Sequence, residues 1–279
     1  MAQMKYNKPA FFASVGNGLE MHYNREKGGG DPLILLHGGG QGAGGWTNWK
    51  TNLKPLAAAG YDVVAPDAIG YGLSSKPEDG DFDFDSLVAA FSRFVDEMGY
   101  EKISLVGNSM GGAMSLRYAQ LNPDRIKKLS IMGSAGLGTM EGVYKNMPAI
   151  KLLLDLGQRM KGGITREGLA EFLRFLAYDP AEVTDEMLDE RFEIAKTQPA
   201  RVFSTISIPD LRGDMEAIRH IPMFIFWGRD DKAAPVSTGL DLMDSFDKCR
   251  MLIFSECGHW VQQEHSAEFN RACLQFLEQ

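Results

Sequence analysis

Cysteine is scarce in this chain, and the few cysteines present are not spaced for cross-linking or metal binding. There are three, Cys249, Cys257 and Cys273, and no Cys-x-x-Cys motif occurs. So small a set predicts neither a disulfide framework nor a zinc site, and we expect no metal and no cofactor. Free thiols suit a reducing compartment, so we expect a cytoplasmic protein.

Long apolar runs and an excess of positive charge are also missing. No stretch approaches the roughly 20 apolar residues of a membrane span, and residues 1–9 lack the apolar run of a signal peptide. The net charge of −8 argues against nucleic acid or an anionic membrane as a partner. It does not exclude a small anionic substrate, because such a substrate responds to the local field of its pocket.

The 279 residues do contain short apolar segments that alternate with amphipathic ones. This pattern is typical of an α/β fold with a mostly parallel sheet and helices on both faces. It predicts strands at 11–15, 19–23, 33–36, 61–65, 129–132, 223–227 and 251–254, with a further strand leading into residue 107, and helices at 47–59, 84–98, 111–121, 236–246 and 264–278.

The alternation stops between two of these strands. Residues 140–212 carry only helical periodicity, and they are rich in Met, Leu and Phe. The predicted helices are 148–160, 165–178, 184–196 and 199–206. We therefore expect a helical cap, or lid, over residues 140–212, inserted in a core domain formed by residues 1–139 and 213–279. Its side chains should form an adaptable apolar wall.

Ser109 stands at the centre of a Gly-x-Ser-x-Gly motif, between an apolar strand and a helix. A strand that turns into a helix within one or two residues strains the central residue and leaves no room for flanking side chains. Gly107 and Gly111 provide that room, which exposes the hydroxyl at the top of the sheet. The N–H groups of the helix favour negative charge there. We predict that Ser109 is a nucleophile; the alternative is an idle serine in a tight turn.

A serine nucleophile needs a base, and five histidines are available. His259 is favoured because it follows the last strand, at the sheet edge where open α/β folds bind ligands. His22 and His220 are predicted to lie at the surface, and His265 to cap or pair with the last helix. His37 could orient the glycine-rich loop beside it.

The base in turn needs an orienting carboxylate, for which the loop after residues 223–227 offers Asp230 and Asp231. The spacing Gly-x-x-Asp-x-x-x-Pro favours Asp231, and leaves Asp230 as a solvated or capping residue. Asp67 also ends a strand. However, it precedes the serine, whereas the order expected for this kind of sheet is Ser, Asp, His, so Asp67 is predicted to be structural.

The oxyanion formed during acyl transfer needs two N–H donors. The backbone N–H of Met110 should supply one, and the loop at residues 37–40 should supply the other, most simply from Gly39. A phosphate cradle is the alternative role for this glycine-rich loop. It is weak, because the Gly-x-x-x-x-Gly-Lys-Ser/Thr pattern is absent.

Five stretches together resemble the α/β-hydrolase superfamily and, more closely, its meta-cleavage-product hydrolases. Those enzymes cleave carbon–carbon bonds in ring-fission products of aromatic degradation. The stretches are residues 37–48 (His-Gly-Gly-Gly-Gln-Gly-Ala-Gly-Gly-Trp-Thr-Asn), 107–112 (Gly-Asn-Ser-Met-Gly-Gly), 132–137 (Met-Gly-Ser-Ala-Gly-Leu), 227–231 (Trp-Gly-Arg-Asp-Asp) and 257–260 (Cys-Gly-His-Trp). The chain departs from many relatives at Gln41, where they carry proline.

The resemblance implies an anionic substrate, a 2-hydroxy-6-oxohexa-2,4-dienoate with an alkyl or aryl group at C6. Water would split it into 2-hydroxypenta-2,4-dienoate and a carboxylic acid. Asn48, Asn108, Arg191 and Trp260 match family positions that hold the dienoate end. Their plain alternatives are a helix cap for Asn48, a turn residue for Asn108 and packing for Trp260. Because relatives are often dimers or larger, we expect a homo-oligomer.

Arg191 is also singled out by helical periodicity. Its neighbours three and four residues away, Met187, Leu188, Ile194 and Ala195, are all apolar, which places the guanidinium on the predicted buried face. A buried charge needs a partner. That partner could be the substrate carboxylate, held by the arginine fork. It could instead be an acidic residue of the core domain, or the side chain could extend to water.

Two other functions remain open at this stage. A carboxylesterase would use the same serine, histidine and aspartate, so the predicted triad does not exclude it. A non-catalytic ligand receptor built on the same fold is disfavoured, because such a receptor has no use for His259 and Asp231 at these positions.

Overall fold

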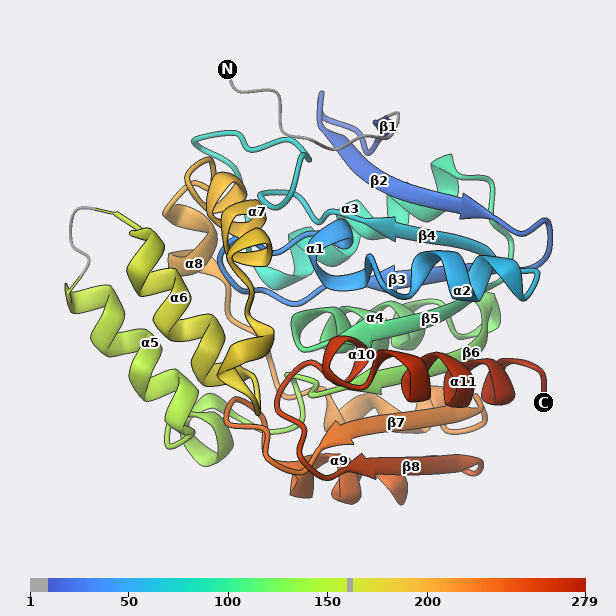
Figure 1. The fold of residues 1–279 in the computed structure, drawn as a ribbon. Helices are drawn as coiled ribbons and strands as arrows, with labels where there is room; N and C mark the ends of the chain where they lie inside the picture. Colours follow the sequence, from blue (N-terminus) through green and yellow to red (C-terminus); the bar gives the residue numbers. More distant parts are fainter. Residues whose placement is uncertain (1–9, 160–162) are drawn as a thin grey trace.

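The computed structural model describes residues 10–159 and 163–279 (Figure 1). The N-terminal segment 1–9 and the end of the helix predicted at 148–160 lie outside the described residues. Within them, eight strands form one sheet in the order β1-β2-β4-β3-β5-β6-β7-β8. The strands are β1 (Phe11–Ser14), β2 (Glu20–Lys27), β3 (Pro32–Leu36), β4 (Asp62–Pro66), β5 (Ile103–Asn108), β6 (Ile126–Met132), β7 (Met223–Gly228) and β8 (Cys249–Phe254).

Strands β3 to β8 run parallel, and β1 and β2 form an antiparallel hairpin added at one edge. Every residue of β4 and β5 is buried. Parallel strands buried on both faces are continuously apolar, which is why these segments stand out in the sequence. Because parallel strands end at the same edge, the loops after β3, β5, β7 and β8 converge there.

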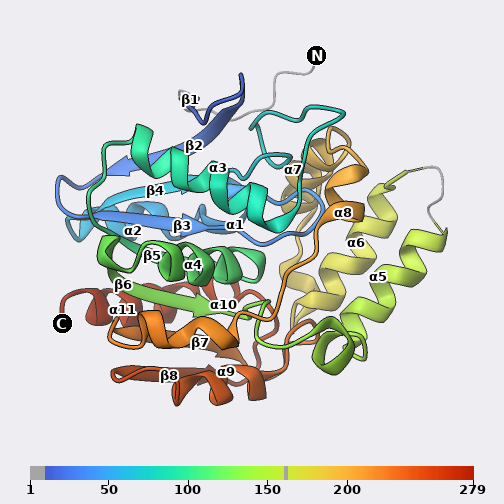
Figure 2. The same cartoon turned by 180° about the vertical axis from the view of Figure 1, so that it is seen from behind.

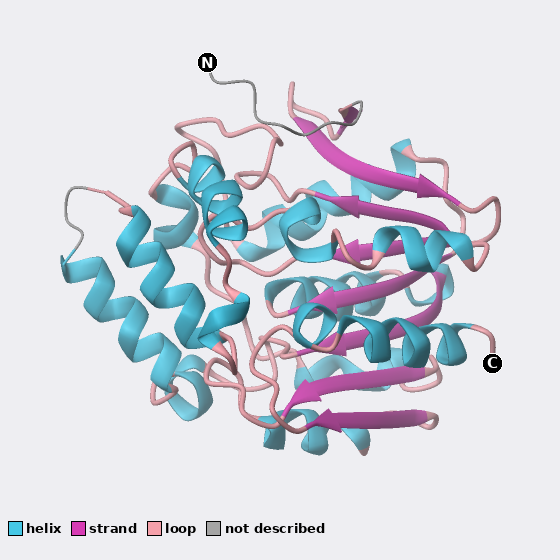
Figure 3. Cartoon of the chain, viewed as in Figure 1, coloured by secondary structure: helices cyan, strands magenta, loops and turns pink. Residues whose placement is uncertain are grey.

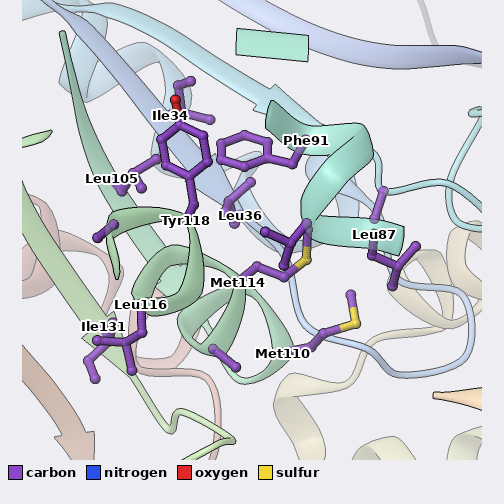
Figure 4. Packing of buried hydrophobic residues seen from close by; sticks show 14 of the residues in the cluster. Ile34, Leu36, Leu87, Phe91, Leu105, Met110, Met114, Leu116, Tyr118 and Ile131 are labelled. Atoms are coloured by element: carbon purple, nitrogen blue, oxygen red, sulfur yellow. The ribbon is translucent and has the colours of Figure 1, made fainter. Parts of the chain in front are cut away.

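Helices cover both faces of the sheet, as predicted. The helices α1 (Gly45–Trp49), α2 (Leu53–Ala58), α10 (Val261–Glu264) and α11 (Ser266–Leu277) lie on the face in front in Figure 1. The opposite face, seen in Figure 2, carries α3 (Phe84–Glu97), α4 (Met110–Leu121) and α9 (Val236–Met243). In Figure 4, Met114 and Tyr118 of α4 pack between Phe91 of α3 and the apolar side chains of the sheet. This packing fixes α4, and with it the position of Ser109.

Two predicted helices are each broken in two. The segment predicted at 47–59 forms α1 and α2, because the chain turns at the fully buried Asn52. The Asn52 amide donates to the Gln262 carbonyl at 3.0 Å and to Asn270 Oδ1 at 2.9 Å. The segment predicted at 264–278 divides into α10 and α11 at His265. This residue pairs with Glu268 at 3.7 Å, one of the two roles predicted for it, and its side chain makes no cap hydrogen bond. The first break depends on partners that are distant in sequence.

The prediction that His22 lies at the surface is wrong. Its side chain is buried, and Nδ1 lies 2.8 Å from Asp67 Oδ2. Because β2 is flanked by β1 and β4, the alternating pattern of an edge hairpin does not apply to it. Asp67 also accepts the backbone N–H groups of Gly45 and Leu73, which is the structural role predicted for it. His220 is exposed, as predicted.

Beyond the carboxyl ends of the strands lies a helical block, separate from the sheet in Figure 3. It comprises η2 (Met140–Tyr144), α5 (Pro148–Arg159), α6 (Arg166–Leu176), η3 (Pro180–Glu182), α7 (Asp185–Ala195) and α8 (Arg201–Thr205), and a further turn, η4 (Arg212–Ile218), leads back to β7. The four helices predicted here are confirmed, whereas η4 was not predicted. Leu173 and Leu188 belong to an apolar cluster of this block, which also includes Trp260 of the core.

Candidate active site

A cavity of about 230 Å³ lies between the converging loops of the sheet and the helical block. Ser109 and His259 line it from the sheet side, and Arg191 lines it from α7. Its remaining wall is largely apolar and includes Ile150, Leu153, Phe172, Leu173, Phe203 and Ile206. Methionine was expected in that wall, but Met110, the one methionine among the described lining residues, comes from α4.

Ser109 has the strained backbone that the flanking glycines predict. It lies between β5 and α4 with φ of 56° and ψ of −117°, a left-handed conformation that non-glycine residues rarely adopt. A Cβ on Gly107 would overlap the carbonyl of Gly111, and a Cβ on Gly111 would overlap the carbonyl of Leu36. The N-terminus of α4 therefore presents the hydroxyl at the cavity.

His259 and Asp231 form a buried pair at the same edge of the sheet. The distance from His259 Nδ1 to Asp231 Oδ2 is 2.8 Å, and the side chains are 7% and 1% exposed. Asp231 Oδ1 accepts the N–H groups of Ala233 and Ala234, which fixes the carboxylate. Gly133 makes room for the pair, because a Cβ there would lie 3.0 Å from both side chains.

The electrostatics of this pair suit a general base. Burial acts to lower the pKa of His259, whereas the charge of Asp231 and its hydrogen bond act to raise it. Together with a smaller effect of Glu264, they raise the pKa above its ordinary value. Since a carboxylate accepts, Nδ1 carries the proton, and Nε2 of the neutral ring is left free to take one.

Asp230 does not share this role. Its Oδ2 lies 3.6 Å from the Arg229 guanidinium, and its backbone N–H donates to the carbonyl of Cys257 at 3.0 Å. The loop spacing therefore identified the aspartate that contacts His259.

The glycine-rich loop lies directly against the start of α4. A Cβ on Gly38 would be 3.3 Å from Ser109 Cβ, and one on Gly39 would be 3.3 Å from Met110 Cβ. A Cβ at either position would force its neighbour to move by a few tenths of an ångström, so glycine is favoured at both. The N–H groups of Gly39 and Met110 thus belong to neighbouring segments that line one cavity.

His37 orients this loop, as its position suggested. Its Nε2 accepts the N–H of Ala68 at 2.9 Å, so the proton must sit on Nδ1, which donates to the Gly38 carbonyl at 2.7 Å. Burial lowers the pKa of His37, which keeps the ring neutral in this arrangement. The hydrogen bond ties down the Gly38 carbonyl beside the Gly39 N–H.

Arg191 is buried in α7, as the helical pattern predicted, with an exposed fraction of 2%. Its guanidinium donates to the Thr47 carbonyl and to Asn48 Oδ1, both at 3.3 Å, and lies 5.1 Å from the centre of the Trp260 ring. These oxygens are neutral. Among the described residues lining the cavity, Arg191 is the one that carries a permanent positive charge.

Asn48 and Asn108 connect Arg191 to the loop of His259. Asn48 Nδ2 donates to Asn108 Oδ1 at 3.1 Å, and Asn108 Nδ2 donates to the carbonyl of His259 at 3.2 Å. Asn48 lies within α1 and does not cap it. The sequence gives no sign of this polar chain, because its members come from distant segments and meet only in the folded protein.

The described residues hold no group of three His, Cys, Asp or Glu side chains placed to bind a metal ion. In the same part of the chain, no helix is long and apolar enough to cross a membrane.

Comparisons with known proteins agree on one family. The model of the alpha/beta hydrolase fold matches residues 31–162. The chain is 35% identical to a 2-hydroxy-6-oxo-6-phenylhexa-2,4-dienoate hydrolase of Comamonas testosteroni, over 93% of this chain and 91% of that protein. It is 32% identical to a 2-hydroxy-6-oxononadienedioate/2-hydroxy-6-oxononatrienedioate hydrolase of Pseudomonas putida, over 96% of both chains.

Solved structures give the same result. A serine hydrolase involved in carbazole degradation has a TM-score of 0.81 and 30% identity, covering 97% of this chain and 98% of its own. A meta-cleavage product hydrolase from Pseudomonas fluorescens IP01 has a TM-score of 0.80 and 28% identity, covering 97% of each chain.

Proposed function

Because the chain belongs to the meta-cleavage-product hydrolases of the α/β-hydrolase superfamily, we propose that it hydrolyses a carbon–carbon bond in 2-hydroxy-6-oxohexa-2,4-dienoates. The products are 2-hydroxypenta-2,4-dienoate and a carboxylic acid. The observation that carries this proposal is one cavity that presents Ser109, His259 and the cation of Arg191 together.

The reaction requires proton transfer at three points in this site. The dienol first ketonises, so that C5 carries a proton and the C5–C6 bond can break with its electrons leaving as a stabilised carbanion. His259, oriented by Asp231, takes a proton from Ser109 or from water for attack on the C6 carbonyl. Water finally supplies a hydroxyl to C6 and a proton to the carbon fragment. Attack by Ser109 gives an acyl-enzyme, and attack by water gives a gem-diol.

The N–H groups of Gly39 and Met110 stabilise the oxyanion that forms at C6. The support is the contact between the glycine loop and the first residue of α4, together with the His37 hydrogen bond that orients the loop. Donors fixed in this way act where negative charge develops, without further reorganisation.

Arg191 binds the carboxylate of the dienoate, and Asn48, Asn108 and Trp260 hold it in place. The guanidinium is buried, contacts neutral oxygens and faces the cavity. A substrate carboxylate in the cavity would form charge-assisted hydrogen bonds with this guanidinium. The carbonyl end of the substrate then extends toward Ser109 and the C6 group toward α5, α6 and α8.

The group at C6 is uncharged and apolar. The relatives fall into two classes by name, one with a phenyl group and one with a second carboxylate in a nonadienedioate. The cavity wall contributed by α5, α6 and α8 consists of Ala, Ile, Leu and Phe side chains, and Arg191 is the one permanent cation in the described lining. A second carboxylate there would be desolvated without a partner, which is costly.

Residues 140–212 act as a lid that closes the cavity over Ser109. The support is that α5 to α8 form the cavity wall opposite the catalytic loops. Pockets of this kind commonly lie between two such structural blocks.

We further propose that the protein is a cytoplasmic homo-oligomer assembled through the sheet edge at β8. Leu240, Leu252 and Ile253 are exposed around this edge, at 47%, 37% and 42%. An open apolar edge strand favours pairing. If two copies pair antiparallel about Leu252, Lys248 of one copy lies opposite Glu256 of the other, so charge complements the apolar contact.

The test is a panel of ring-fission products assayed by loss of their yellow colour, beside simple aryl esters. A 6-phenyl or 6-alkyl dienoate should be cleaved with a higher kcat/KM than a nonadienedioate and than any ester. Preference for esters would indicate a carboxylesterase. Binding of dienoates without turnover would indicate a receptor.

A further inference from the structure

Glu264, which ends α10, is a half-buried carboxylate at the junction of the helical block and the core. Its Oε1 accepts the N–H of Trp260 at 2.9 Å. Its Oε2 accepts the N–H groups of Gly258 at 2.9 Å and of Tyr178 at 2.8 Å. Two of these donors flank His259, and the third follows α6 in the helical block. Hydrogen bonds to an ionised acceptor are stronger than those between neutral groups.

A second set of contacts joins the same two segments. The backbone N–H of His259 donates to the carbonyl of Leu176 at 3.1 Å, and Leu176 is the last residue of α6. Gly258 lies so close that a Cβ would overlap this carbonyl. Since Leu176 also lines the cavity, the cavity wall and the loop of His259 are in direct contact here.

We propose that Glu264 is a positioning residue that holds the His259 loop and the end of α6 in one fixed arrangement, so that the imidazole and the substrate-binding wall keep their relative positions. This inference rests on the proposed role of His259 as the base. Glu264 itself touches none of the reacting atoms. It acts through the backbone on both sides of His259.

Helix capping alone does not account for these contacts. The bond from Trp260 to Glu264 resembles a capping interaction, because a side chain in the first turn accepts the N–H of the residue before the helix. The bonds from Gly258 and Tyr178 lie outside that pattern. Tyr178 belongs to a segment 86 residues away.

Several ionisable groups face this junction. Asp231 and Glu264 both act to raise the pKa of His259. Glu182 of η3 lies nearby: burial, Glu264 and Asp179 raise its pKa, and His265 acts to lower it. Removing the charge of Glu264 therefore leaves Asp231 as the main group that raises the pKa of His259.

Two substitutions distinguish the effect of the negative charge of Glu264 from the effect of its side-chain length. In Glu264→Gln the side chain keeps its length but loses the charge, and its amide NH₂ cannot accept an N–H. In Glu264→Asp the charge remains, but the shorter side chain cannot reach all three donors. Glu268→Gln is the matched control, because Glu268 is 55% exposed and pairs with His265 and Arg271 of its own helix turn.

The kinetic test measures kcat, KM and the pH profile of kcat/KM with a 6-phenyl dienoate and with an aryl ester. Both Glu264 variants should lose roughly 10–100-fold in kcat, as expected for small misplacement of a reacting group, with a smaller change in KM. The acidic limb should shift to lower pH in Glu264→Gln and stay in place in Glu264→Asp. Glu268→Gln should match the wild type.

Amide hydrogen exchange tests the positioning independently of turnover. The N–H groups of Tyr178, Gly258 and Trp260 should exchange faster in both Glu264 variants, while the central strands keep their protection. Wild-type kcat in both variants, or loss of protection spread over the whole sheet, would overturn the inference. If the wild type cleaves only esters, the proposed substrate is wrong, and the Glu264 comparison still holds on the ester. Wild-type protein inactive on both substrates would overturn both proposals.

Discussion

The position of Arg191 fits its proposed role, which is to bind the carboxylate of the substrate. Its helical neighbours are apolar, its exposed fraction is 2%, and it lines the cavity from α7. Its Asn48 partner is neutral and belongs to a chain of amides that ends at the loop of His259. Arg191 could therefore bind a substrate carboxylate and link its binding to the position of the base.

Substitution of Arg191 tests carboxylate binding directly. Arg191→Gln should lose about 2–4 kcal/mol in kcat/KM on a dienoate, the range for truncating one member of a buried charged pair. It should lose little on a neutral aryl ester. Arg174→Gln, on the exposed side of the neighbouring α6, is the control. Equal losses on both substrates would show that Arg191 only holds α7 against the core.

The pH dependence follows from the surroundings of His259. The base must be neutral, so kcat/KM should rise with pH through the raised pKa, with a midpoint above the ordinary histidine value of about 6.5. In Asp231→Asn burial becomes the dominant effect on this pKa. The midpoint should then move to lower pH, while kcat falls by as much as about 10⁴-fold. An acidic limb that stays in place in Asp231→Asn would contradict the pairing.

Among the elements, α6 has two faces with different roles. Phe172, Leu173 and Leu176 line the cavity. Phe175 lies on another side of the helix, 4.8 Å from Lys232 Nζ. The helix thus contributes to the substrate pocket on one side and to the contact with the core on the other.

This difference gives a matched pair of substitutions for the proposed lid. Phe172→Ala should shift the preference between small and bulky C6 groups toward the bulky ones, by roughly 10–200-fold in the ratio of kcat/KM values. Phe175→Ala removes the same volume outside the described cavity lining and should leave the ratio unchanged. The measurement is kcat/KM for 6-methyl and 6-phenyl dienoates. Equal ratios in both variants would argue against a lid that discriminates between substrates by the size of the C6 group.

Elements also differ in how well the sequence predicts them. The central strands were predicted because burial on both faces makes them continuously apolar. The turn at Ser109 was predicted because only glycines fit beside it. The breaks at Asn52 and His265 were not, because local periodicity continues through them. The partners of Asn52, Gln262 and Asn270, are distant in sequence. The partner of His22, Asp67, and the amide chain from Arg191 to His259 were missed for the same reason.

On the scale of the whole molecule, one edge of the sheet carries exposed apolar side chains that favour association with a second copy. The hairpin β1–β2 forms one edge, and β8 forms the other with exposed Leu252 and Ile253. An interface between identical edges is closed by a two-fold axis. Such a dimer would leave the cavity of each copy free, because the cavity lies at the carboxyl ends of the strands.

Sedimentation velocity tests this assembly. The wild type should sediment as a dimer or larger species, and Ile253→Lys should shift it toward the monomer by placing a charge in the paired edge. Leu154→Lys, which replaces an apolar residue of α5 that is 62% exposed, should leave the assembly unchanged. A monomeric wild type at micromolar concentration would rule out the β8 dimer.

Above all, we propose that Ser109 is needed for carbon–carbon cleavage and not for the ketonisation that precedes it. The most direct measurement is rapid mixing of a 6-phenyl dienoate with Ser109→Ala, followed by absorbance and by product analysis. We predict that the variant binds the dienoate and can still ketonise it, but forms benzoate and 2-hydroxypenta-2,4-dienoate several orders of magnitude more slowly than the wild type. Formation of both products at a near-normal rate would contradict it.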